Sequence, residues 1–171
     1  MKRKYSILIN YGTFLTEYQG IIIITRYMDN ESKRQTQWAE PLPDSCPPVE
    51  AKSPNGEQYF RLVSTFPPAQ DDFLSQRALN PIKKYFVGEC RARSTSLFAS
   101  YEECFSITKL PTHSEKNESV VSIMLPTHCG VIMPTPTLVH PSHVSWWRSY
   151  GFDPIACCQE ASKLITKGDN Q

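Results

Sequence analysis

The 171-residue chain lacks several features that would assign it to a functional class. Its formal net charge is only +1, so it lacks the strongly basic character typical of general nucleic-acid-binding proteins. The isoleucine run at 21–24 is far shorter than the roughly 20 apolar residues that cross a bilayer. There is no internal repeat, and no small-residue cleavage pattern follows the basic start at 1–4. We therefore expect a soluble, cytoplasmic protein of about one domain, with no membrane contact.

The six cysteines include no Cys-x2-Cys pair, the spacing that many zinc sites use. Their number would allow three disulfides, but a chain of this length can build a core without such cross-links. We predict reduced thiols that pack as small buried hydrophobic groups, and no structural metal site. The residues that this prediction covers are the cysteines Cys46, Cys90, Cys104, Cys129, Cys157 and Cys158 and the histidines His113, His128, His140 and His143.

Changes in composition divide the chain into four segments. β-branched and alternating patterns at 5–9 and 20–27 predict two short strands, whereas prolines and polar residues dominate the stretch that follows. The predicted segments are an N-terminal β extension or hairpin at 1–28, a Pro-rich linker or loop at 29–57, a main domain at 58–165 and a loose tail at 166–171.

Strand and helix patterns alternate along the main domain, and all of them are short. This order predicts an α+β fold with a single core, built from a small mixed sheet and two or three short helices. β-branched and aromatic residues mark the strands, whereas capping residues and prolines mark the helix ends. The predicted strands are 58–65, 90–98, 119–125 and 130–133, and the predicted helices are 71–79, 101–109 and 153–165.

Arginines within two of these strands are candidate ligand-binding residues. Arg61 interrupts an apolar strand, where it either faces solvent, which alternation favours, or turns into a cleft to hold a carboxylate or phosphate. On the predicted strand 90–98, Arg91 and Arg93 would share one face, while hydroxyl groups including that of Ser96 would share the other. Such a strand could supply cations and hydroxyls to an anionic ligand.

Glu103 has two possible roles. Ser100 followed three residues later by Glu103 matches a capping box, in which each side chain satisfies the other's exposed backbone donor. This structural role is the favoured one. In the alternative role, Glu103 acts in catalysis, holding a ribose hydroxyl and stabilising positive charge that develops at a sugar carbon.

The segment 140–148 combines two histidines, two tryptophans and an arginine. His143 is a candidate general acid or base near neutral pH. Trp146, Trp147 and Arg148 are candidates for a partner-binding surface. The alternative, in which the tryptophans pack in the core, is favoured because large aromatic side chains dominate burial in small folds.

Several of these stretches resemble RES-domain NAD-consuming toxins and, more distantly, other ADP-ribosyltransferase-like folds. They are Tyr59-Phe-Arg-Leu62, the Ser94-Thr95-Ser96 triplet, Leu97-Phe98-Ala-Ser-Tyr-Glu-Glu103 and the strand Val120 to Leu125. The resemblance implies that Arg61 contacts the nucleotide of NAD, that Arg91 or Arg93 pairs with a phosphate, and that Glu103 supports cleavage of the nicotinamide–ribose bond. The Gly-Gly-Arg-Trp-Asn type element of RES domains is absent from this chain.

A second resemblance is to small bacterial proteins that have no assigned activity. Those proteins share a Tyr-Arg-Leu-Val-like strand, a Pro-Pro then Asp-Phe turn, an Arg-x-x-Ser-Leu-Phe strand and a His-x-x-Trp-Trp ending. The corresponding stretches of this chain are 60–63, 67–73, 93–98 and 143–147.

Two functional hypotheses follow from the sequence. The first, favoured slightly, is a non-catalytic interaction protein of a bacterial toxin–antitoxin or defence system that binds another protein. The second is an ADP-ribosyltransferase-like enzyme that cleaves NAD or transfers ADP-ribose. A common cleft for Arg61 and Glu103 would support the enzyme. Solvent exposure of Arg61, with Glu103 serving only as a cap, would count against it.

Overall fold

The computed structural model describes residues 6–8, 13–18, 21–26, 38–113, 116 and 118–161, with side chains described from residue 38 onward. The chain divides into two compact units, Met1–Thr36 and Gln37–Gln171. The boundary falls at 36/37, so most of the predicted linker at 29–57 belongs to the larger unit. The predicted tail at 166–171 lies outside the described residues.

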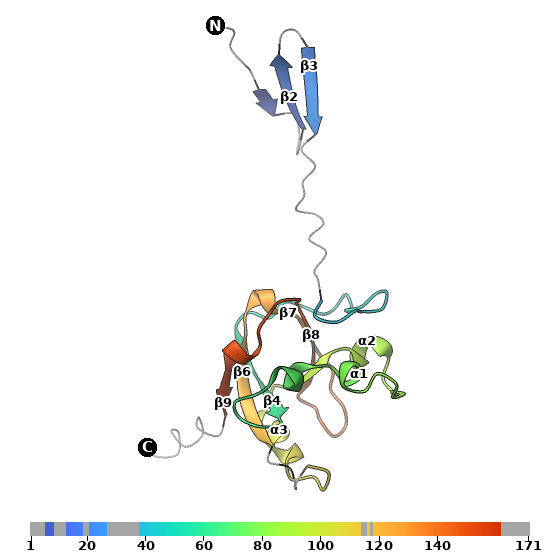
Figure 1. Ribbon diagram of the computed structural model, residues 1–171, viewed down its shortest axis with the longest axis vertical. Helices are drawn as coiled ribbons and strands as arrows, with labels where there is room; N and C mark the ends of the chain where they lie inside the picture. Colours follow the sequence, from blue (N-terminus) through green and yellow to red (C-terminus); the bar gives the residue numbers. More distant parts are fainter. Residues whose placement is uncertain are drawn as a thin grey trace, which may run out of the picture. The chain divides into compact units, whose positions relative to one another are not determined.

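The smaller unit is an antiparallel sheet of three strands in the order β1-β2-β3 (Figure 1). Threonine and aromatic residues favour an extended chain at 13–18, a strand that the sequence analysis missed. This strand pairs with the isoleucine run in a register from Thr13↔Arg26 to Tyr18↔Ile21. The strands are β1 (Ser6–Leu8), β2 (Thr13–Tyr18) and β3 (Ile21–Arg26).

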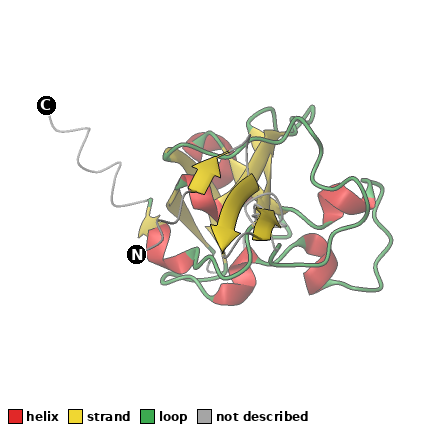
Figure 2. Ribbon diagram, turned by 90° about the horizontal axis from the view of Figure 1, so that it is seen from above, coloured by secondary structure: helices red, strands yellow, loops and turns green. Residues whose placement is uncertain are grey.

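The larger unit is built on a six-stranded sheet in the order β7-β8-β5-β4-β6-β9. The α+β prediction is confirmed, and every described pairing in this sheet is antiparallel rather than mixed. Figure 2, coloured by secondary structure, shows that the described helices are short and are joined to the strands by long loops. The strands are β4 (Glu57–Val63), β5 (Thr95–Phe98), β6 (Ser119–Leu125), β7 (Gly130–Pro134), β8 (His143–Arg148) and β9 (Cys158–Glu160).

Both faces of the sheet are buried. Leu97 and Phe98 are neighbours in β5 and therefore point to opposite faces. Leu97 joins a cluster with Phe73 and Trp146, whereas Phe98 joins a second cluster with Cys104. The second cluster is covered by α3 (Tyr101–Ile107), which contacts β4, β5 and β6. This arrangement places the start of α3 next to the β5 and β8 ends that carry the candidate site.

Two predicted elements differ from the structure. The first residues of the predicted strand 90–98 form a helix, α2 (Glu89–Ala92), and only Thr95–Phe98 is extended. The predicted terminal helix from 153 is replaced by a 3-10 turn, η4 (Ile155–Cys157), and the strand β9. The reason is tertiary: β9 pairs with the edge of β6, which outweighs the helical preference of so short a segment.

The predicted helix at 71–79 is broken into two pieces, a 3-10 turn, η2 (Gln70–Phe73), and α1 (Gln76–Leu79). Ser75 separates them because its hydroxyl caps the second piece, accepting a hydrogen bond from the Ala78 amide at 3.0 Å. None of the described helices is long and apolar enough to cross a bilayer.

A disulfide joins Cys46 to Cys90, so the prediction of reduced thiols is wrong for this pair. It ties the segment that precedes β4 to α2. The same segment also bridges the sheet, through Trp38↔Ser149 and Lys52↔Ile132. Cys104 and Cys129 are buried thiols, as predicted, and burial raises the pKa of each to about 12.

Candidate functional site

A cleft of about 460 Å³ opens beside β4, β5 and β8. Its volume lies in the range of small-molecule sites. Three histidines, an arginine and several carboxylates contribute to its walls, together with apolar side chains such as Phe98. The polar residues that line it are Arg61, Ser64, Asp71, Asp72, Gln76, Ser96, His113, Glu118, His140 and His143.

Arg61 is held in the cleft by backbone carbonyl groups. Its Nε donates to the carbonyl oxygen of Asp72 and its Nη1 to that of Ser96. The guanidinium lies over the ring of Phe73, with Cζ 5.8 Å from the ring centroid. These contacts fix the guanidinium plane. The third guanidinium nitrogen, Nη2, takes part in neither hydrogen bond.

The charge of Arg61 is only weakly compensated. Among the residues that the structure describes, no carboxylate forms an ion pair with it. Asp72, the acid whose charge acts on Arg61, uses its two carboxylate oxygens to accept 2.8 Å hydrogen bonds from the amides of Ser64 and Ala69. Withdrawal from water outweighs the attraction of Asp72 and lowers the pKa of Arg61 to about 10. At neutral pH this group is still a cation, and an anionic ligand would stabilise it.

His140 lies between the cleft and the carboxylate of Glu103. Its Nδ1 is 3.5 Å from Oε1 of Glu103, and both atoms are buried without a hydrogen bond of regular geometry. The other oxygen, Oε2, accepts a 3.0 Å hydrogen bond from the amide of Ser142. Because Nδ1 faces Glu103, Nε2 is the ring nitrogen left for a ligand in the cleft.

Glu103 therefore forms only half of the predicted capping box. The Ser100 hydroxyl does accept from the Glu103 amide at 3.2 Å. The Glu103 side chain does not return to the Ser100 amide, which instead donates to Oγ of Ser142 at 3.3 Å. Ser142, in the loop before β8, thus accepts from the Ser100 amide and donates to the Glu103 carboxylate, which lies toward His140.

The ring of His143 is held by hydroxyl groups. Its Nδ1 is 2.8 Å from Oγ1 of Thr135, which in turn is 2.9 Å from Oγ of Ser145. The pKa of His143 lies below its usual range, chiefly because burial disfavours the imidazolium, with further contributions from Arg91 and His140. The ring is therefore neutral at pH 7.

His113 completes the set of histidines in the cleft. Its Nδ1 pairs with Oε2 of Glu118 at 2.8 Å, and Lys116 approaches the other oxygen of the same carboxylate at 3.8 Å. Although three histidines share the cleft, no described group of three or more His, Cys, Asp or Glu side chains is placed to hold a metal ion.

The structure brings together only part of the site predicted from the sequence. Arg61, Ser96 and His143 line one cleft, whereas Glu103 reaches it only through His140. Arg91 donates from Nη2 to the carbonyl of Thr135 at 2.7 Å. Arg93 is the C-cap of α2 and pairs with Glu89 at 2.9 Å, so it does not share a strand face with Arg91.

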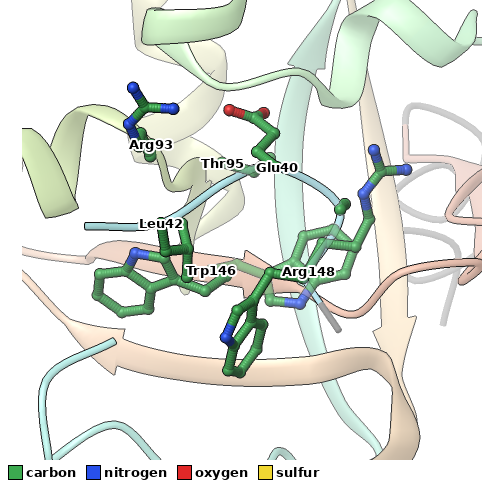
Figure 3. Close-up of a pocket in the computed structure, with 9 residues that line it drawn as sticks. Glu40, Leu42, Arg93, Thr95, Trp146 and Arg148 are labelled. Atoms are coloured by element: carbon green, nitrogen blue, oxygen red, sulfur yellow. The ribbon is translucent and has the colours of Figure 1, made fainter. Parts of the chain in front are cut away.

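The predicted partner surface is largely inside the protein. Trp146 and Trp147 are 0% and 2% exposed, in agreement with the alternative in which the tryptophans pack in the core. Figure 3 shows Trp146 below the segment that carries Glu40 and Leu42, with the side chain of Arg148 beside that segment. The indole groups of both tryptophans donate to backbone carbonyls, those of Cys129 and Cys90. These two side chains are buried and are not available to a partner.

Three residues important to the cleft lacked a recognisable pattern in the sequence. Thr135 and Glu118 orient histidines, and the backbone of Asp72 holds Arg61. Comparison with known proteins finds no match for this chain, whether among protein-family models, curated proteins or solved structures.

Proposed function

We propose that the chain binds a phosphate-bearing ligand, such as a nucleotide, in the cleft around Arg61. The observation that carries this proposal is the state of the guanidinium: it is half-buried, oriented by two carbonyl groups and without a carboxylate ion pair among the described residues. A phosphate group would supply the missing negative charge and accept a charge-assisted hydrogen bond from Nη2.

Two of the three carboxylates that line the cleft are engaged within the protein. Asp72 accepts from two backbone amides, and Glu118 pairs with His113 and Lys116. The third, Asp71, is exposed to solvent, so water screens its repulsion of an anion. His140 and His143 can donate from Nε2 to phosphate oxygens when protonated. Phe98, in edge contact with both imidazoles, gives the cleft an apolar wall for a base or sugar.

The test is a titration followed through the imidazole signals of the protein in NMR spectra. Inorganic phosphate, pyrophosphate, mononucleotides and NAD would each be added to the full chain. We expect shifts for the cleft histidines His113, His140 and His143. His128 lies outside this cleft and serves as the internal control.

Replacement of Arg61 should weaken this binding strongly. Arg61→Lys keeps the charge but not the planar fork of donors, and we expect an affinity loss of about tenfold or more for the nucleotide that binds best. Gln70→Ala, at an exposed position near the same turn, is the matched control and should bind normally. If no phosphate compound shifts the cleft histidines of the unmodified protein at millimolar concentration, the proposal fails.

NAD has a particular place in this titration because of the resemblance to ADP-ribosyltransferase-like enzymes. Direct action of Glu103 on the ribose would need the carboxylate in the cleft, but it faces Ser142 and His140. Release of nicotinamide from NAD, and its loss in Glu103→Ala, would support that enzyme activity as the use of the site. Binding of NAD without release would leave the simpler binding function.

A second candidate function, binding of another protein, is supported by an exposed apolar loop between α1 and α2. Ile82 is 97% exposed, and Phe86 is fully exposed. Arg77 holds this loop from inside, donating to the carbonyls of Pro81 and Lys83 at 2.7 and 2.9 Å, so the apolar side chains project outward. The two lysines between them, Lys83 and Lys84, favour a partner with acidic groups around an apolar pocket.

This function would be tested by changing the loop without touching the cleft. The double variant Ile82→Ser, Phe86→Ser should lose at least tenfold in affinity for a partner that the unmodified chain binds, because such exposed anchors contribute most of the energy of small interfaces. Val49→Ser is the matched control, since Val49 is 94% exposed but lies outside this loop. Equal loss in both variants would show that the loop is not the contact surface.

A further inference from the structure

We propose that the same cleft catalyses cleavage of a phosphodiester in which the carbon next to the esterified carbon carries a hydroxyl group. His143 is the general base and His140 the general acid, and Glu103 positions His140. The substrate class is a ribodinucleotide or short oligoribonucleotide. This inference rests on the proposed binding of a phosphate group near Arg61, and it adds chemistry to that binding.

The first support is the arrangement of the two imidazoles. Both rings line the cleft, and both make edge contacts with the ring of Phe98, at centroid distances of 5.6 Å for His140 and 5.5 Å for His143. Each ring directs Nδ1 to a partner within the protein. Each therefore has Nε2 left for the ligand, so two proton-transferring atoms are available to one substrate.

The second support is that the two imidazoles have different surroundings. His140 faces a buried carboxylate of Glu103, which can compensate the charge of a doubly protonated ring. His143 faces neutral hydroxyl groups, those of Thr135 and, beyond it, Ser145. Thr135 can accept the Nδ1 proton while donating its own to Ser145, which leaves the lone pair of the His143 imidazole on Nε2. Two titratable groups whose environments differ in this way are typical of an acid and a base that act together.

The unpaired state of the His140–Glu103 contact also points to function. The Nδ1 and Oε1 atoms face each other at 3.5 Å, although both are buried and have no other hydrogen-bond partner. Buried polar groups are normally paired, so a contact left long requires a reason. Catalytic hydrogen bonds are often long without substrate and shorten when it binds. Protonation of His140 at Nε2 would strengthen this contact in the same way.

The reaction balances with these groups alone. Nε2 of His143 takes the proton of the neighbouring hydroxyl, whose oxygen forms a bond to phosphorus. The bond from phosphorus to the leaving oxygen breaks, and Nε2 of His140 gives its proton to that oxygen. Arg61 would hold a non-bridging phosphate oxygen through Nη2, where negative charge increases in the transition state. The products are a cyclic phosphate and an alcohol, and no oxidant or reductant takes part.

The size and charge of the protein favour a small substrate of this class. A cleft of about 460 Å³ accommodates a ligand of dinucleotide size rather than a folded RNA. The formal net charge of +1 provides little attraction for a long polyanion. A substrate with few phosphates, one of them at Arg61, fits both observations.

The reaction should depend on pH through His143. Burial is the largest cause of the lowered pKa of His143, and the charged and titratable groups around its ring are Arg91, His140 and Glu103. The base is active when neutral, so kcat/KM should fall as the pH is lowered through the pKa of His143. Because that pKa lies below the usual histidine value of about 6.5, the fall should occur on the acidic side of 6.5.

The experiment uses the full chain and the ribodinucleotide uridylyl-adenosine, with formation of the cyclic phosphate followed by phosphorus NMR. His143→Gln and His140→Gln should each lower kcat by about 100-fold or more. Glu103→Gln should lower kcat with little change in KM and should alter the pH profile, since this residue positions His140. His128→Gln, purified in parallel, should retain full activity. A contaminating nuclease would instead give equal activity in all of these variants.

The deoxy analogue of the dinucleotide separates this inference from the proposed function. It lacks the attacking hydroxyl, so it should bind and shift the cleft histidines without being cleaved. If the ribodinucleotide also binds but the unmodified protein forms no cyclic phosphate, the catalytic inference is overturned and phosphate binding stands. If neither dinucleotide binds, the catalytic inference is overturned, and phosphate binding is decided by the titration with inorganic phosphate, pyrophosphate, mononucleotides and NAD. These outcomes depend on the unmodified protein, so they hold even if a histidine variant does not fold.

Discussion

Gly130→Ala is expected to destabilise the larger unit by on the order of 4 kcal/mol, enough to unfold many domains of this size. Gly130 begins β7 with φ of +128°, a conformation that side chains rarely adopt. A Cβ atom at this position would meet the carbonyl oxygen of Trp147 at 2.1 Å. That oxygen belongs to the backbone of β8, so it cannot move without displacing the paired strand.

Chemical denaturation followed by tryptophan fluorescence would measure this loss. Gly88→Ala is the matched control, because Gly88 has a negative φ of −57° and a Cβ atom added there would meet no other atom within 4 Å. We expect that control to unfold within about 1 kcal/mol of the unmodified protein. A Gly130→Ala protein that unfolds at the same denaturant concentration would show that β7 and β8 do not approach as described.

Loss of the Cys46–Cys90 disulfide is expected to lower the free energy of unfolding by about 4 kcal/mol, the chain-entropy value for a loop of this length. The bond spans 44 residues, and those residues include β4, η2 and α1. Without the bond, the unfolded chain gains freedom, while the folded segment before β4 keeps only its bridges to the sheet, such as Lys52↔Ile132.

The double variant Cys46→Ser, Cys90→Ser and the reduced form of the unmodified protein should unfold at the same lowered denaturant concentration. Cys157→Ser is the control, since Cys157 is a partly exposed free thiol. Addition of a reductant should have no further effect on the double variant. An unmodified protein whose unfolding is insensitive to reductant would show that the two thiols are not joined.

The strands that can be predicted from sequence alone are those whose pattern of apolar residues lies within a single segment of the chain. Ser119–Leu125 matches its predicted limits because a stretch rich in β-branched and apolar residues ends at Pro126. The helix after Ser100 begins as predicted because the cap acts within a single turn. By contrast, α2 could not be separated from β5, since the break depends on Gly88 and on the turn that follows Arg91.

The candidate site was harder to predict because most of its contacts join distant parts of the chain. Arg61 was identified as unusual, but its orientation depends on the carbonyl of Ser96, a residue 35 positions away. Glu103 was correctly placed at a helix start. Its side-chain partners come from the loop 39 residues later, which no capping pattern describes. Residue types thus singled out candidate residues, whereas the pairing of groups came from the fold.

The outer edge of β7 gives the sheet a further property, resistance to association with other chains. An exposed edge strand offers unpaired amides and carbonyls to a strand from a second molecule. Here Lys52 exchanges both backbone hydrogen bonds with Ile132, at 2.9 and 2.8 Å, and so occupies part of that edge. The disulfide at Cys46 anchors the covering segment nearby in the chain. Reduction of this bond would therefore weaken a barrier to aggregation as well as the fold itself.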